Sequence, residues 1–151
     1  MTSRPFHRPL RIAACAAIAA VLAACGGGDD PGAGGAAAQL TIDMVEFAFD
    51  PVNATVVAGQ QVEVTVNNVG SIRHEWVVLQ EGVRLEDEAD KPDDEAVFQS
   101  DFVHFEIDLE AGLSETGTMT APGNPGTYQI VCAIPGHLSA GMVGELEVVA
   151  P

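Results

Sequence analysis

The sequence is short of basic residues, cysteines and aromatic residues. Six Lys and Arg stand against 22 Asp and Glu, which gives a net charge of −16 over 151 residues. Binding to nucleic acid through phosphate neutralisation is excluded, because it needs a basic surface. Three cysteines are too few for a disulfide scaffold. Since 47 % of the residues are hydrophobic, the chain is nevertheless apolar enough to bury a core.

The N-terminal apolar run is too short to cross a membrane. It covers residues 12–24, which is 13 residues against about 20 for a transmembrane helix. A head containing three arginines precedes this run, as in a secretory signal. The run ends in Leu22-Ala23-Ala24-Cys25, which resembles the bacterial lipoprotein signal. We therefore predict that residues 1–24 are removed and that Cys25 is lipidated; the alternative is an ordinary cleaved signal in which Cys25 is accidental.

Residues 25–38 have a composition that cannot build a core. After Cys25 they contain six Gly, four Ala, two Asp and one Pro, which is typical of a flexible tether. Several acyl chains on Cys25 would anchor the protein durably in a membrane. We expect a membrane-anchored lipoprotein on the periplasmic face. By analogy with known lipoproteins, Gly26 in place of Asp favours the outer membrane over the inner one.

Residues 39–151 alternate between apolar and polar side chains in short runs separated by Gly and Pro. The clearest run, Val62-Glu63-Val64-Thr65-Val66-Asn67, is typical of a half-buried strand. Similar runs cover residues 40–46, 53–57, 74–79, 103–109, 115–120, 127–132 and 142–149. No amphipathic helix is evident. The pattern predicts an all-β domain, a two-sheet Greek-key β-sandwich of about eight antiparallel strands.

One segment, residues 81–95, departs from this pattern. It holds eight acidic residues against Arg84 and Lys91. The segment is either a solvated surface loop or a docking patch that speeds the encounter with a basic partner. A calcium site is a weaker alternative, because the segment lacks the spacing of an EF-hand loop. The sequence leaves these interpretations open.

Cys132 is the only cysteine beyond Cys25. A solitary thiol in an exported protein is either a small buried hydrophobic residue or a functional group. Four residues separate Cys132 from His137, and four more separate His137 from Met142. A thiolate, an imidazole and a thioether on one short loop form a soft ligand set that suits copper.

Strand alternation extends this set to a fourth residue. Cys132 and Met142 share their faces with the core-facing residues of their strands. His74 begins the run 74–79 and shares its face with Trp76. We therefore expect His74, Cys132, His137 and Met142 to converge at one end of the sandwich.

The remaining histidines and methionines fit a ligand set poorly. His7 lies in the predicted signal, and His104 is out of phase with its apolar neighbours, so we interpret it as a surface residue. Met44 and Met119 are expected to fill the core.

Residues 49–149 resemble the cupredoxins, the small blue (type 1) copper proteins such as plastocyanin and azurin. The resemblance is carried by four pieces of sequence: Phe-Asp-Pro at 49–51, the segment starting at Gly59, His-Glu-Trp-Val-Val at 74–78, and the segment from Gly126 through Cys132 and His137 to Met142. The loop spacing is most similar to that of rusticyanin and auracyanin. The resemblance implies one copper ion, two imidazole ligands (His74 and His137), a thiolate ligand (Cys132) and a weak axial ligand (Met142).

The residue after the first histidine departs from the family pattern. Plastocyanin-like members often have Asn there, whereas this chain has Glu75. The Glu75 carboxylate either stabilises Cu(II) as a second-shell group or faces solvent. The family also implies that His137 is the electron port, with Ile134, Pro135, Leu138 and Ala140 around it.

These features predict a lipid-anchored electron carrier rather than an enzyme. All four ligands are protein groups, so no position is left for a small-molecule substrate. The resemblance implies redox partners, such as a cytochrome, an oxidase or reductase, or a photosynthetic complex, and the acidic charge favours partners with basic faces. Two alternative functions remain for the same fold. One is a periplasmic copper-binding or delivery protein with the same ligands, and the other is an adhesion or structural module without metal.

Overall fold

The computed structural model describes residues 37–151, without the side chain of Glu88. The predicted signal peptide, Cys25 and nearly all of the tether lie outside the described residues. Within residues 37–151, none of the helices is long and apolar enough to cross a membrane.

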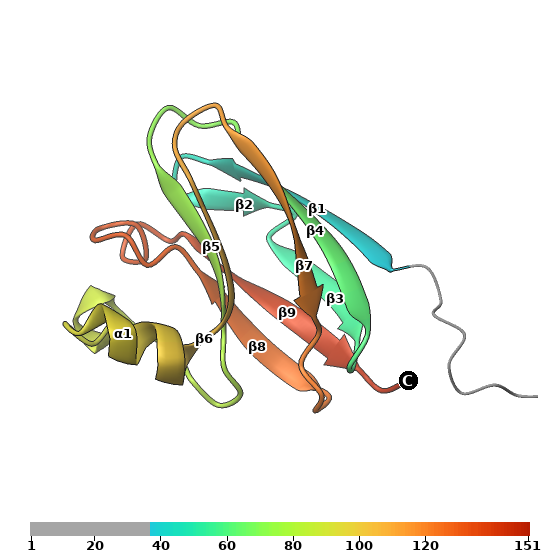
Figure 1. Ribbon diagram of the computed structural model, residues 1–151. Coiled ribbons are helices and arrows are strands. Elements are labelled where there is room, and N and C mark those ends of the chain that lie inside the picture. Colours follow the sequence, from blue (N-terminus) through green and yellow to red (C-terminus); the bar gives the residue numbers. More distant parts are fainter. Residues whose placement is uncertain (1–36) are drawn as a thin grey trace, which may run out of the picture. The chain divides into compact units, whose positions relative to one another are not determined.

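Residues 37–151 contain nine strands, which form two sheets that face each other (Figure 1). The first sheet has the order β2-β1-β4-β7 and the second has the order β3-β9-β8-β5-β6. The strands are β1 (Ala38–Val45), β2 (Ala48–Asp50), β3 (Asn53–Val57), β4 (Gln61–Asn68), β5 (His74–Leu79), β6 (Val103–Leu109), β7 (Ser114–Thr120), β8 (Gly126–Val131) and β9 (Val143–Val149). The prediction of an all-β, two-sheet sandwich is confirmed.

Two details of the predicted sandwich are wrong. The pattern missed β2, which at three residues is too short to show alternation. The pairs β1–β4 and β3–β9 are parallel, although antiparallel strands were expected throughout. The reason is that the chain moves to the second sheet at β3 and returns to the first at β4, so that β4 runs beside β1 in the same direction.

The main core lies between the two sheets. Alternate residues of β4, Val62, Val64 and Val66, point into it and are fully buried. Met44 and Met119 also belong to this core, as expected. The alternating pattern of β4 was readable because only one of its faces is buried.

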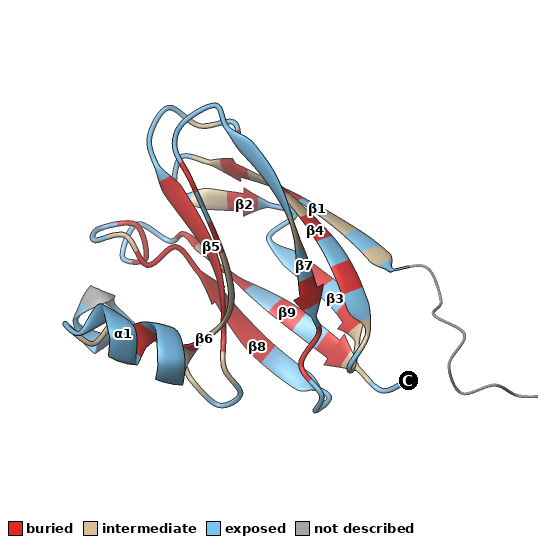
Figure 2. Ribbon diagram, viewed as in Figure 1, coloured by how far each residue is buried: buried red, intermediate tan, exposed pale blue. Residues whose placement is uncertain are grey.

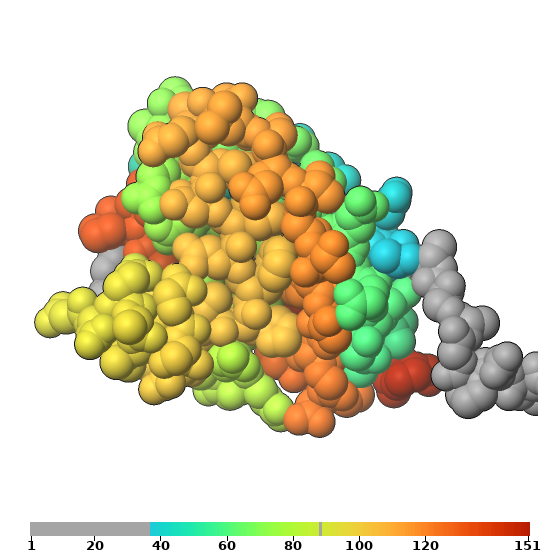
Figure 3. All heavy atoms as spheres, viewed as in Figure 1, coloured from blue at the N-terminus to red at the C-terminus, as the bar shows by residue number. Residues whose placement is uncertain are grey.

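Strand β5 is buried along its whole length (Figure 2). Its second face packs on a smaller cluster that includes Leu85 and Phe98 from the chain between β5 and β6. That chain contains three short helical turns, a 3₁₀ turn (Glu88–Asp90), α1 (Glu95–Val97) and a π turn (Phe98–Phe102). Figure 3 shows this yellow segment on the surface beside β6.

The acidic segment 81–95 is therefore anchored rather than a free loop. Leu85 is buried, and the Gln129 side chain holds both its N–H and its carbonyl, at 2.8 and 3.0 Å. Lys91 pairs with Glu95 at 3.2 Å and lies 4.4 Å from the centroid of the Phe98 ring. Segment 81–95 has eight acidic residues, of which seven have described side chains. All seven are exposed, as in a solvated surface segment.

We predict that Gly144→Ala destabilises the domain. Gly144 lies in β9 against the backbone of Val52, and an added Cβ would overlap the Val52 carbonyl oxygen. Because backbone cannot move aside as a side chain can, we expect a loss of about 1–3 kcal/mol in the free energy of unfolding. Urea unfolding followed by circular dichroism measures it. The control is Gly123→Ala, where nothing lies within 4 Å; equal midpoints for the two variants would contradict the prediction.

Candidate metal centre

Cys132 lies at the end of β8 and is fully buried. Its backbone N–H donates to the Met142 carbonyl at 3.1 Å, which ties the two ends of the β8–β9 loop together. Its Sγ accepts the backbone N–H of Glu75, at 3.4 Å. Burial raises the pKa of the Cys132 thiol, while backbone N–H groups of Glu75 and Ile134 act in the opposite direction by favouring the thiolate. An apolar site that also supplies donors to sulfur suits a metal-bound thiolate.

His137 lies within the β8–β9 loop and is 8 % exposed. The loop closes tightly, since the His137 N–H donates to the Ile134 carbonyl and the His137 carbonyl accepts the Met142 N–H, both at 3.0 Å. Gly136 and Gly141 take positive φ angles of 89° and 99°, which a glycine adopts without strain. The loop thereby points Nδ1 of His137 at Sγ of Cys132, at 3.2 Å.

His74 is the first residue of β5 and is fully buried. Its Nδ1 lies 3.2 Å from Nδ1 of His137. Burial, and then the neighbouring His137, lower the pKa of His74, which favours the neutral imidazole. A neutral imidazole is the form that ligates metals.

The structure brings three of the predicted ligands together. One donor atom each from His74, Cys132 and His137 lies within 4.8 Å of the others. The fourth predicted ligand, Met142, is fully buried in the same core cluster as Cys132 and joins the other two loop ligands through its backbone. The four residues form a set of the type 1 copper kind.

The donor chemistry fits a copper ion. Two ring nitrogens and a sulfur face one another at short range, and a proton on both nitrogens would leave two N–H groups opposed. A cation satisfies all three lone pairs at once. Imidazole, thiolate and thioether together are the donors found in blue copper sites.

Glu75 lies inside the protein and does not face solvent. It is 7 % exposed, and its carboxylate accepts from Arg73 at 3.1 Å. Arg73 also donates to Asp108, with 2.8 Å between Nε and Oδ1. Burial, more than any other cause, raises the pKa of Glu75. The contact of Glu75 with a candidate ligand is made by its backbone N–H, which donates to the Cys132 sulfur, while its carboxylate pairs with Arg73.

Phe47 is a residue at the site that the sequence reasoning missed. Its ring lies edge-on to both imidazoles, with centroids 5.2 Å from His137 and 6.5 Å from His74. It is 40 % exposed and has a φ of 60°, a conformation that costs a bulky residue about 1–3 kcal/mol. Nothing in the sequence pattern marks Phe47, because the β1–β2 turn that holds it was not predicted.

The residues expected around His137 divide into two groups. Pro135 and Ala140 are exposed and Ile134 is partly buried. Leu138 instead packs into the second core cluster, and so helps to hold the loop.

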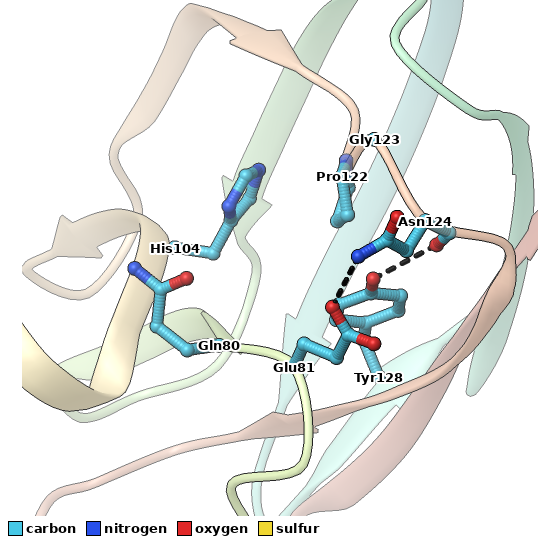
Figure 4. Close-up of a pocket in the computed structure, with 7 residues that line it drawn as sticks. All are labelled: Gln80, Glu81, His104, Pro122, Gly123, Asn124 and Tyr128. Atoms are coloured by element: carbon cyan, nitrogen blue, oxygen red, sulfur yellow. Dashed lines mark hydrogen bonds between the residues drawn. The ribbon is translucent and has the colours of Figure 1, made fainter.

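His104 lies apart from the candidate ligands. It is only partly exposed, and its Nε2 is 2.8 Å from the Thr120 carbonyl oxygen. It lines a pocket of about 230 Å³ with Glu81, Asn124 and Tyr128 (Figure 4). This pocket lies beyond the end of β5 opposite to His74, so His104 has no place in the metal centre.

Comparisons with known proteins agree with this geometry. The copper-resistant cuproprotein CopI of Rubrivivax gelatinosus is 32 % identical over 119 residues, which are 75 % of this chain and 68 % of that protein. The structure of reduced auracyanin from Roseiflexus castenholzii matches with a TM-score of 0.62 and 33 % identity, over 76 % of this chain and 99 % of that one. Auracyanin A, a "blue" copper protein from Chloroflexus aurantiacus, matches with a TM-score of 0.56 and 28 % identity, over 74 % and 100 %.

A family profile covers most of the chain as well. The profile of copper binding proteins of the plastocyanin/azurin family matches residues 36–149, which include every candidate ligand. The chain therefore belongs to the plastocyanin/azurin family of copper-binding proteins, the cupredoxins.

Proposed function

We propose that this protein is a lipid-anchored, extracytoplasmic blue copper protein that carries single electrons. His74, His137 and Cys132 are the equatorial ligands and Met142 is the axial one. The convergence of three buried donor atoms within 4.8 Å carries the proposal. Family members are generally electron carriers, and copper supplies the one-electron chemistry.

The protein's part is to hold the donors still. His74 begins β5 and Cys132 directly follows β8, the adjoining strand of the same sheet, and backbone hydrogen bonds fix the loop that carries His137. Donors that need not move when the charge of the site changes keep the barrier to electron transfer low. The N–H of Glu75 adds a fixed dipole that stabilises the sulfur's negative charge.

We propose that electrons enter and leave through His137. Among the four ligands it is the one with measurable exposure, at 8 %, and Pro135 and Ala140 beside it are exposed. The partners are redox proteins, a cytochrome, an oxidase or reductase, or a photosynthetic complex. Beyond residue 24 the chain has all 22 acidic residues and only Arg73, Arg84 and Lys91 as basic ones, so we expect partners with basic docking faces.

A second candidate function is copper binding and delivery with the same ligands. The name of its relative, a copper-resistant cuproprotein, favours this candidate. The two functions differ in what the copper does: a carrier keeps it through many redox cycles, whereas a delivery protein releases it.

We predict that the copper-loaded protein absorbs intensely in the visible range and that Cys132→Ser abolishes this absorption. The reason is that the band arises from the thiolate–Cu(II) bond, which serine does not supply. Absorption and EPR spectra of the oxidised protein measure it. Met119→Leu is the control, because Met119 is a buried core methionine outside the ligand set.

Two outcomes would count against the proposal. A colourless wild-type protein after copper loading, or an unchanged band in Cys132→Ser, would remove the blue copper site. A blue protein that shows no reversible one-electron couple in voltammetry, and that loses copper rapidly to a chelator, would support delivery instead of electron transfer.

We predict that Cys25→Ser releases the protein from the membrane when the full chain is made in a bacterial host. The serine cannot accept the lipid, so the variant should leave the membrane fraction and lose incorporation of labelled palmitate. Cys15→Ser, within the predicted signal, is the matched control and should remain in the membrane. An unlabelled wild-type protein would show that Cys25 is accidental, and gradient separation of the two membranes would test the outer-membrane location.

A further inference from the structure

The β1–β2 turn contributes two neighbouring residues, Glu46 and Phe47, to the metal centre. Strands β1 and β2 pair up to Val45 and Ala48, so these two residues form the whole turn. Phe47 has a φ of 60°, in a region where Gly and Asn are the usual residues of tight turns. A strained backbone conformation at a bulky aromatic residue beside the candidate metal centre suggests that the Phe47 ring has a functional role there.

The Phe47 ring lies against the two histidines at right angles. Its plane makes an angle of 90° with the His137 ring and 86° with the His74 ring. The two imidazoles themselves are 4.9 Å apart, so one phenyl ring contacts both. Phe47 as a whole is 40 % exposed, whereas both histidines that its ring contacts are buried.

We propose that Phe47 is a positioning and shielding residue of the copper site. Its ring fixes the orientation of His137 and prevents small ligands and chelators from reaching the metal. This inference rests on the proposed copper site and deepens it, since retention of copper is what separates a carrier from a delivery protein.

The test is Phe47→Gly in the copper-loaded protein. Glycine adopts the left-handed conformation freely, so the turn is kept while the ring is removed. We expect Cu(I) transfer from the dithionite-reduced protein to bathocuproine disulfonate to become at least about tenfold faster, the scale on which groups around a metal act. For the oxidised proteins, we also expect azide to alter the visible spectrum of the variant and to leave the wild-type spectrum unchanged.

Three controls make the result specific. Phe47→Tyr keeps a ring and should behave as the wild type, whereas Phe47→Asn, which also tolerates this conformation, should behave as Phe47→Gly. Leu113→Ala removes a hydrophobic side chain that is 55 % exposed in the β6–β7 turn and should change neither readout. The proposal would be overturned by a Phe47→Gly protein that is blue, releases copper at the wild-type rate and shows no spectral change with azide. That result would leave the proposed copper site unaffected.

An independent observation concerns Glu46 and Nε2 of His74, the ring nitrogen that does not face His137. Nε2 of His74 is buried and has no hydrogen-bond partner among the described residues. A Cβ placed on Gly70 would lie 3.2 Å from Oε1 of Glu46, 3.3 Å from Oδ1 of Asn68 and 3.3 Å from this nitrogen. The three polar atoms therefore surround one small space, which exists because residue 70 has no side chain.

The two oxygens are held by hydrogen bonds from neighbouring residues. Oε1 of Glu46 accepts the Ser71 hydroxyl at 2.7 Å and also the Ser71 N–H. These bonds hold the pKa of Glu46 below its usual value, so the group is a carboxylate at neutral pH. Oδ1 of Asn68 accepts the Gly70 N–H at 3.1 Å.

We infer that Glu46 is a second positioning residue, which stabilises the oxidised site through His74. With Nδ1 bound to copper, the neutral imidazole carries its proton on Nε2, on the side of these oxygens. A negative charge there increases the electron density on the ligand and favours the more positive metal state. This inference also rests on the proposed copper site.

The test is Glu46→Gln, which keeps an oxygen for Ser71 and removes the charge. We expect the reduction potential to become more positive while the blue absorption is retained. The control is Glu63→Gln, which removes another exposed carboxylate, on β4, and we expect a smaller shift from it because only Glu46 lies around the space beside His74. Equal potentials for the two variants would overturn the inference, and loss of colour in the wild type would instead remove the copper site.

Discussion

The pairing of β5 with β8 is the constraint on which the metal centre depends. The two strands are antiparallel, with Val77 opposite Val131, so that the start of β5 and the end of β8 meet at the same end of the sheet. This register brings the Glu75 N–H to the Cys132 sulfur and places His74 at that end as well. A slip of one residue would turn Cys132 to the other face of the sheet, because strand side chains alternate. Two segments more than fifty residues apart thus supply donors to one point.

Burial on both faces of β5 sets the chemistry of that point. The main core covers one face, and the cluster with Leu85 and Phe98 covers the other. In such surroundings the charged forms of His74 and Cys132 are costly, and their pKa values move in opposite directions for the same reason. Burial thus favours the neutral thiol of Cys132 and the neutral imidazole of His74. A bound cation would favour the Cys132 thiolate and offset the cost of burying its charge.

The sequence predicted those parts of the structure that depend on periodicity and residue type. Alternation located β4 and the strand that begins at His74, and the donor chemistry of Cys132 and Met142 pointed to copper. Turns carry no such period. The β1–β2 turn was therefore missed, and with it both Phe47 and the arrangement of Glu46 around Gly70. The parallel pairs were missed for a related reason, because the direction of a strand depends on where the chain changes sheets and leaves no mark in the strand itself.

An electron carrier and a copper-delivery protein need the same donors but opposite access to them. Delivery requires a partner to reach the metal, whereas an electron crosses a covering side chain without moving it. Here His74, Cys132 and Met142 have no exposed surface, and His137 has 8 %. Backbone hydrogen bonds that join Met142 to Cys132 and to His137 hold the loop in place around these donors. The edge of His137, by contrast, needs no rearrangement to meet a partner. The enclosure of the donors therefore favours electron transfer over delivery, although both functions begin from one set of ligands.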